Sequence, residues 1–148
     1  RMRVVLAHPL QELRTADARA VLPAEIPRDV ALRQMANVAA IVAALHAGDL
    51  GLLGRSLVDE IAEPARKGLI PGFDAVKAAA LDAGANGASI SGAGPTVFAV
   101  CDSDVGAQRV SHAMRDAFER QGIEANVRVA RVDTHGARVE SDPPAGRG

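Results

Sequence analysis

Residues 87–101 read GASISGAGPTVFAVC, and this stretch decides the fold. Two runs of strand-forming residues, 87–91 and 96–101, flank a turn made of Gly92, Ala93, Gly94 and Pro95. Glycine at two of the turn positions permits a positive φ and a close approach of another backbone or of an anion. The stretch therefore predicts two neighbouring strands joined by a tight turn, with Cys101 as a buried thiol at a strand end.

Strand and helix patterns continue on both sides of this pair. Apolar β-branched residues predict a first strand over residues 3–7. Alternating valines predict a last strand over residues 127–132, with Arg128 and Arg131 facing water. Val139 is a candidate extension of this last strand. Helical spacing and capping residues predict helices over 16–22, 30–46, 50–61, 73–83 and 104–121, with irregular residues at 63–68.

This order of elements predicts the fold class. Without the extra helices after the first strand, the order is β-α-β-β-α-β, which is typical of an α+β, ferredoxin-like split βαβ sandwich. We expect an antiparallel sheet with helices on one face and the extra helices inserted after the first strand. Thr15 is the expected N-cap of the first helix. Asp102, Ser103 and Asp104 supply the cap candidates of the last helix, and the two aspartates are the simplest choice.

Residues 30–46 form the most apolar predicted helix. Alanines between the larger apolar residues widen its apolar stripe, so we expect this helix to be buried on most sides. The longest uninterrupted apolar run, residues 38–45, is well short of the roughly 20 residues that span a bilayer, so we expect no membrane segment. The first residues lack the pattern of a signal peptide, and we expect a cytoplasmic protein.

Composition limits the function classes. The chain has 148 residues, 48% of them hydrophobic, which is enough for one domain; we place it at 1–140 and expect 141–148 to be a disordered tail. A net charge of −1 and only 3 aromatic residues argue against nucleic-acid binding. One cysteine excludes an internal disulfide and a multi-cysteine zinc site, and the histidines lack metal-ligand spacing.

The glycine-rich stretch also resembles a known motif. Residues 87–99 are similar to the third, C-terminal glycine-rich motif of the GHMP small-molecule kinases, which include galacto-, homoserine, mevalonate and phosphomevalonate kinases. Further segments resemble the homoserine kinase branch, and the resemblance runs from about residue 3 to about residue 135. The similar segments are residues 15–23, 34–37, 48–50, 59–66 and 69–73.

The resemblance implies a function for the chain. It would be the substrate-binding C-terminal half of an ATP-dependent homoserine kinase, which transfers a phosphoryl group from MgATP to the hydroxyl of L-homoserine in threonine biosynthesis. The phosphate-binding loop of such kinases, a Pro-x-x-x-Gly-Leu-Gly-Ser-Ser-Ala motif, has no match here. ATP and Mg²⁺ would be held mainly by an N-terminal kinase domain absent from this chain, and we expect the chain alone to be inactive.

Two arginines are the candidate substrate-binding residues. Arg19 and Arg66 have the planar guanidinium that binds a carboxylate through two hydrogen bonds, although by the sequence alone both could be ordinary surface residues. The resemblance implies that they grip the α-carboxylate of the substrate. It also implies that the glycine-rich loop lines the cleft, whereas no catalytic residue and no metal ligand is assigned. The loop residues are Ser91, Gly92, Ala93, Gly94 and Thr96.

Other polar residues receive weaker interpretations. The hydroxyls of Ser89, Ser91 and Thr96 would lie beside exposed backbone N–H groups and form an anion-binding nest. Asn37 is expected to hydrogen-bond a neighbouring loop. The acidic residues at a helix end are expected to form a solvated face, and these are Asp59, Glu60 and Glu63.

Two alternatives remain open. The first alternative to a homoserine kinase half is a free-standing module that binds an amino acid without catalysis. The second is the C-terminal domain of another GHMP kinase. A kinase half should expose an unpaired apolar or concave polar face, whereas a regulatory module should form symmetric dimers through sheet edges. Whether the chain is a fragment or a separately encoded half, and whether it forms a homodimer, is also left open.

Overall fold

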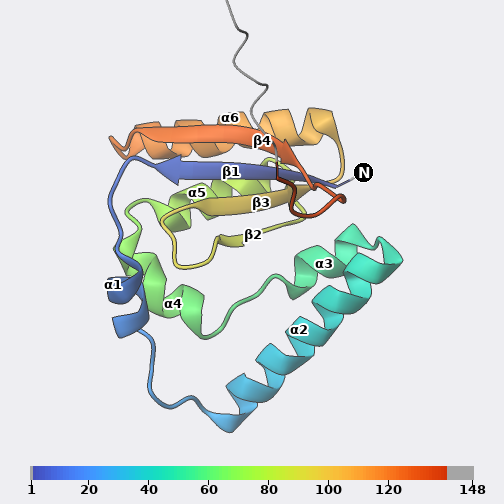
Figure 1. Ribbon diagram of the computed structural model, residues 1–148. Coiled ribbons are helices and arrows are strands. Elements are labelled where there is room, and N and C mark those ends of the chain that lie inside the picture. The colour runs from blue at the N-terminus through green and yellow to red at the C-terminus, as the bar shows by residue number, and fades with distance from the viewer. Residues whose placement is uncertain (1, 140–148) are drawn as a thin grey trace, which may run out of the picture.

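A computed structural model describes residues 2–139, which form one four-stranded sheet with helices around it (Figure 1). The tail expected at 141–148 lies outside the described residues. In chain order the elements are β1 (Arg3–Pro9), α1 (Thr15–Ala20), α2 (Arg28–Ala47), α3 (Leu50–Ser56), α4 (Ala62–Arg66), a 3₁₀ turn η1 (Lys67–Leu69), α5 (Phe73–Asp82), β2 (Gly87–Ile90), β3 (Val97–Cys101), α6 (Asp104–Arg120) and β4 (Ala125–Arg131).

The sheet confirms the predicted fold class, although helices pack on both of its faces and not on one alone. Its strand order is β2-β3-β1-β4, and every neighbouring pair is antiparallel. β1 lies inside the sheet, where Val5 is opposite Ala99 of β3 on one side and Val129 of β4 on the other. This is the order of a ferredoxin-like split βαβ sandwich, with α1 to α4 inserted between β1 and α5.

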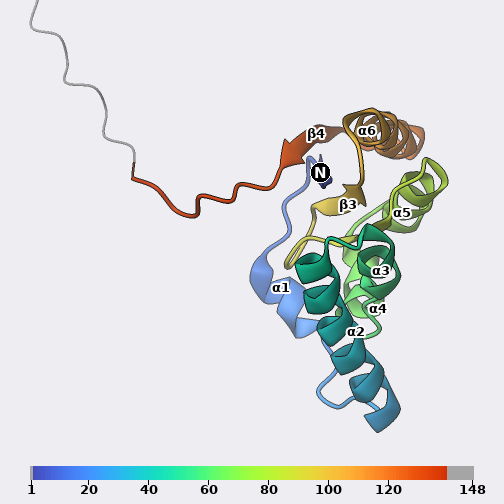
Figure 2. The ribbon, with the colours of Figure 1, turned by 90° about the vertical axis from the view of Figure 1, so that its right-hand side faces the viewer.

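The main core fills the space between the sheet and two helices. Alternate residues of β1 and β3 point to one face of the sheet, and α5 and α6 cover that face (Figure 2). The largest buried side chains there are Phe73 of α5 and Phe118 and Met114 of α6. Cys101 is buried at the end of β3, as predicted, and burial raises the pKa of its thiol.

A second, smaller cluster lies against the opposite face. Ala44 of α2, Leu53 of α3 and Val100 of β3 are its buried members, and Met2 and Phe98 pack against them. The alternation of β3 explains the two clusters, because Ala99 points to the main core while Phe98 and Val100 point to α3. The inserted helices are therefore attached to the sheet mainly through α3.

The expectation that residues 30–46 would be buried on most sides is wrong. Ala44 is the one buried residue of α2, whereas Met35 is 67% exposed and Val42 is 63% exposed. The helix packs substantially only against α3 and projects away from the sheet (Figure 1). An apolar pattern shows which face of a helix is apolar, but the surface that covers this face need not lie in the same segment of chain.

The expectation about membrane segments also needs correction. α2 is 20 residues long, and its length and composition are sufficient to cross a bilayer, although uninterrupted apolar runs within it are shorter. A single helix of this kind is a weak indication of a membrane span, because helices of water-soluble proteins pass the same test. Its exposed apolar face therefore requires another explanation.

Several element boundaries differ from the predictions. The expected helix 50–61 ends at Ser56, and a new helix, α4, replaces the irregular stretch expected from residue 63. Asp59 causes this division, because its Oδ1 accepts hydrogen bonds from the N–H groups of Ile61 and Ala62 and so starts a new turn.

Three terminal positions differ from the simplest predictions. Arg14 occupies the N-cap position of α1, which places Thr15 inside the helix. Of the three cap candidates for α6, Ser103 is the cap, and its hydroxyl accepts from the Gly106 N–H at 3.1 Å. Val139 lies outside the sheet and is fully exposed, so it does not extend β4.

Gly54 fixes how closely α3 approaches the sheet. A Cβ atom built on Gly54 would lie 1.8 Å from the carbonyl oxygen of Asn86, the residue immediately before β2. A backbone carbonyl that is held by the sheet cannot move far enough to accept a methyl group. Only glycine therefore allows this contact between α3 and β2.

We expect Gly54→Ala to lower the free energy of unfolding by about 3 kcal/mol, since the added methyl group forces two backbones apart. Gly51→Ala, on the same helix, is the matched control. A Cβ on Gly51 would meet only flexible side-chain atoms, Asp49 Oδ1 at 3.3 Å and Arg55 Nη1 at 3.5 Å. It should be neutral or stabilising by up to about 1 kcal/mol. Urea unfolding of both variants checks this, and equal stabilities would contradict the close approach.

Candidate functional site

Arg66, in the last turn of α4, joins three separate segments of the chain. Its Nε donates to the carbonyl oxygen of Ala18 in α1 at 2.9 Å, and its Nη1 donates to the carbonyl oxygen of Gly92 at 3.0 Å. A guanidinium has five N–H groups, so these two bonds leave three for a ligand. The glycine-rich loop, α1 and α4 therefore meet around one partly buried cation.

The second predicted arginine lies next to this meeting point. Arg19 follows Ala18, whose carbonyl oxygen is bound by Arg66, so the two predicted residues are brought to one region of the fold. The side chain of Arg19 is exposed and has no hydrogen bond or ion pair among residues 2–139. It is therefore available to bind an anion from solution.

The loop between β2 and β3 combines one packed glycine with one open glycine. Gly94 has φ 87° and lies against the core, because a Cβ there would come within 2.9 Å of Ile70 Cδ1. Gly92 has φ 58° and no heavy atom within 4 Å of its Cβ position. The N–H groups of Gly92 and Ala93 donate to no atom of the described chain. Two backbone donors next to the carbonyl that Arg66 binds therefore lack an acceptor among the described residues.

The predicted hydroxyl nest is only partly assembled. Ser89 donates its hydroxyl to Glu63 Oε2 at 2.8 Å, and Thr96 Oγ1 shares a hydrogen bond of 2.7 Å with His8 Nδ1. Ser91 is exposed, and its hydroxyl has no partner among residues 2–139. Backbone N–H groups, rather than three converging hydroxyls, make this loop suitable for an anion.

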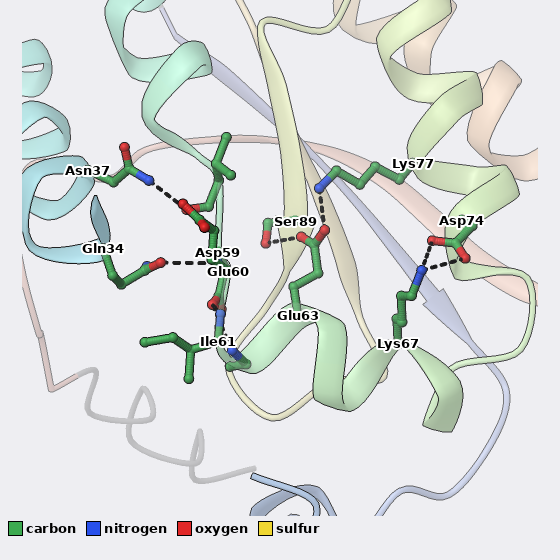
Figure 3. A network of polar contacts seen from close by, with 12 residues as sticks. Gln34, Asn37, Asp59, Glu60, Ile61, Glu63, Lys67, Asp74, Lys77 and Ser89 are labelled. Atoms are coloured by element: carbon green, nitrogen blue, oxygen red, sulfur yellow. Dashed lines mark hydrogen bonds and ion pairs between the residues drawn. The ribbon is translucent and has the colours of Figure 1, made fainter. Parts of the chain in front are cut away.

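The acidic residues expected to form a solvated face are all engaged (Figure 3). Asp59 starts α4, as described above, and Glu60 accepts from Arg33 Nη2 at 2.8 Å. The hydrogen bond from Arg33 holds the pKa of the Glu60 carboxyl below its usual value. Asn37 donates to the carbonyl oxygen of Val58 at 3.0 Å, which confirms its expected bond to a neighbouring loop.

Glu63 anchors α4, so the solvated position expected for it is wrong. Its carboxylate forms an ion pair with Lys77 of α5 and accepts from Ser89 of β2 (Figure 3). The Glu63 side chain is 14% exposed and that of Lys77 is 23% exposed. Because Glu63 lies one turn before Arg66, this ion pair also fixes the position of Arg66. No sequence spacing indicates the pair, since it joins different helices.

The described residues hold no evident metal centre. Among residues 2–139, no three His, Cys, Asp or Glu side chains gather closely enough to hold a metal ion. The candidate site is therefore a cationic, hydrogen-bond-donating surface made by Arg19, Arg66 and two backbone N–H groups. Such a surface fits a small carboxylate or phosphate group.

Comparison with known proteins gives one family. Residues 41–120 match the family described as GHMP kinases C terminal. The homoserine kinase of Chlorobaculum tepidum is 49% identical over 138 residues, which are 92% of this chain and 43% of the relative. The chain therefore spans less than half the length of this curated relative.

Solved structures agree with the sequence comparison. The crystal structure of homoserine kinase from Cytophaga hutchinsonii has a TM-score of 0.89 and 47% identity, and the match covers 91% of this chain and 43% of that one. The mevalonate kinase of L. major has a TM-score of 0.65 at 14% identity, over 88% of this chain and 43% of that one. The latter likeness concerns the fold alone.

We expect Glu63→Ala to lower the free energy of unfolding by about 2 kcal/mol. The substitution leaves the shielded ammonium of Lys77 and the hydroxyl of Ser89 without their acceptor. Asp74→Ala is the control, since it breaks the exposed Lys67–Asp74 ion pair, which should contribute about 0.5 kcal/mol or less. Thermal unfolding measures both, and equal losses would mean that Glu63 anchors nothing.

Proposed function

Because this chain belongs to the GHMP kinase family, we propose that it is the substrate-binding, C-terminal part of an ATP-dependent kinase that phosphorylates L-homoserine. Relatives named homoserine kinase at 47–49% identity support this substrate. Those relatives are more than twice as long as the matched region. We assign their remaining length to an N-terminal domain that binds ATP and Mg²⁺, and we infer that this chain alone is inactive.

The arrangement of Arg66 is the observation that carries the proposal. Its guanidinium is held by the carbonyl oxygens of Ala18 and Gly92. Arg19, which follows Ala18, and the backbone N–H groups of Gly92 and Ala93 have no partner among residues 2–139. In the proposed complex, Arg19 and Arg66 bind the α-carboxylate of L-homoserine through charge-assisted hydrogen bonds. This fixes the substrate at the end opposite its reacting hydroxyl, and positioning of this kind supplies much of the catalysis in phosphoryl transfer.

The glycine-rich loop forms the other part of the proposed site. The N–H groups of Gly92 and Ala93 fit a negatively charged oxygen of a phosphoryl group, because they have no acceptor in the described chain. Bound MgATP supplies the phosphoryl group that the substrate hydroxyl accepts. The residues of this chain bind and orient the substrate, and we assign none of them as a general base.

The main alternative was an amino-acid-binding regulatory module. Such a module would bury its apolar surface within itself or through sheet-edge pairing, whereas this chain exposes one apolar side of α2. That exposed face favours a kinase half over a free-standing module. The C-terminal domain of another GHMP kinase is disfavoured, because the mevalonate kinase above shares only 14% identity with the chain.

We expect Arg19→Ala to raise the KM for L-homoserine about 10- to 100-fold in the complete gene product, since one charge-assisted contact is lost. Arg19 has no hydrogen bond or ion pair among residues 2–139, so its loss should leave the free energy of unfolding unchanged. Arg66→Ala should raise KM at least as much, with some loss of stability. Arg120→Ala, at an exposed position on α6, is the control. A coupled ADP-release assay measures KM. An unchanged KM for Arg19→Ala would show that Arg19 does not bind the substrate.

The 148-residue chain by itself should bind L-homoserine weakly and should not phosphorylate it. A site with one wall absent leaves the ligand in contact with water, so its charged contacts are weakened. Isothermal titration calorimetry together with an ATP turnover assay tests this. Tight binding or steady turnover by the chain alone would show that the two-domain proposal is wrong.

A further inference from the structure

One side of α2 carries a continuous row of exposed apolar side chains, which we call the α2 stripe. Successive members are three or four residues apart, so they lie along one face of the helix. Each is more than half exposed. The members are Leu32, Met35, Val38, Val42 and Leu45.

The stripe continues into an apolar pocket near the beginning of α2. Ile26, from the segment before the helix, and Ile61, from the segment before α4, line this pocket together with Met35 and Val38. Its volume is about 470 Å³, and almost all of its lining is apolar. The pocket therefore offers a recess for one or two large apolar side chains of a partner.

The rest of α2 is already occupied by this chain. Ala44 lies in the cluster beneath α3, Asn37 donates to the Val58 carbonyl, and Gln34 Oε1 accepts from the Glu60 N–H at 3.1 Å (Figure 3). These contacts fix the orientation of the helix. The α2 stripe is thus held in a defined position and turned away from the chain's own core, and patches of this kind mark interaction sites.

The position of Met2 indicates which partner fits. Met2 packs on the cluster of Ala44 and Leu53, at the end of α2 where the helix meets α3. The matched family region is C-terminal, and the similar homoserine kinases have more than half of their length outside the match. A polypeptide that precedes residue 2 would therefore begin beside α2. A tethered domain next to this surface has a high effective concentration and needs only a modest interface.

A second copy of the chain fits the stripe less well. A helix of 20 residues is about 30 Å long, so a stripe about 10 Å wide covers roughly 300 Å². A stable dimer buries about 800 Å² on each partner. The stripe alone is too small for such a dimer, whereas a covalently linked domain is not held by this surface alone.

We propose that the α2 stripe is the docking surface for the N-terminal portion of the same polypeptide. This inference rests on the proposed function, because it requires that an N-terminal portion exists. Apolar side chains of that portion cover Met35, Val38 and Val42 and enter the adjoining pocket. The docking orients the N-terminal portion relative to α4 through the contacts of Gln34 and Asn37 with the segment before α4.

Thiol labelling tests this arrangement. The single native cysteine, Cys101, is buried, so a new cysteine on the surface is the fast-reacting thiol. Val42→Cys places a thiol on the stripe, and Val105→Cys places one on α6, where the native side chain is 76% exposed. Iodoacetamide labelling is followed by mass spectrometry for both variants, in the 148-residue chain and in the complete gene product. L-Homoserine phosphorylation is measured on the same samples.

We expect the N-terminal portion to slow iodoacetamide labelling at position 42 and not at position 105. In the 148-residue chain both cysteines should react at similar rates, while in the complete product Val42→Cys should react at least about tenfold more slowly, because a covered thiol reacts only when the interface opens. Val105→Cys should be equally fast in both.

Three results would overturn the docking proposal. The first is a complete product that phosphorylates L-homoserine while the cysteine of Val42→Cys still reacts rapidly with iodoacetamide. This result would leave the proposed function intact. The second is protection in the 148-residue chain that grows with concentration, which would assign the stripe to a second copy. The third is protection that appears only when phosphatidylcholine–phosphatidylglycerol vesicles are added, which would assign it to a membrane. A complete product that lacks both protection and kinase activity would contradict the proposed function as well.

Discussion

The position of β1 inside the sheet is the constraint on which the rest of the structure depends. β1 is hydrogen-bonded to β3 along one edge and to β4 along the other, so β2, the next strand in the chain, cannot lie beside it. The chain must leave the sheet after Pro9 and return at Gly87. The connection holds the helices α1 to α5 and the 3₁₀ turn η1, and of these helices only α5 covers the main core. The other helices of the connection contribute to the candidate site and to the exposed surface of the insertion.

The candidate site is assembled where this connection returns to the sheet. Glu63 attaches α4 to α5 and β2 through one partly shielded ion pair and one hydrogen bond. One turn later, Arg66 attaches the same helix to α1 and to the glycine-rich loop. A helix of five residues has little stability of its own, so its position is set by these side-chain contacts. The same contacts hold a guanidinium beside two backbone donors that lack an acceptor in the described part of the chain, which makes the region suited to an anionic ligand.

The outer surface follows from the attachment of α2 through only one of its faces. Apolar residues on α2 are numerous enough to suggest a core helix, yet the chain covers only the side that meets α3 and the segment before α4. The glycine at position 54 brings α3 into direct contact with the residue before β2, and α3 in turn carries α2. Arg19 and Arg66 of the candidate site and the exposed stripe therefore belong to the same insertion between β1 and α5.

The strands and most helices could be predicted from the sequence, because they depend on local patterns of two and 3.6 residues and on residues such as Gly48 and Gly92 that accept a positive φ. The fold class followed from the order of these elements along the chain. The sequence also indicated Arg19, Arg66 and the glycine-rich loop through a motif resemblance. Only the tertiary structure decided the partners of Glu63 and Arg66 and the exposure of α2. Glu63 meets Lys77 across two helices, and the Arg66 acceptors belong to distant segments. Periodicity identifies the apolar face of a helix, but only the packing of distant segments determines what covers it.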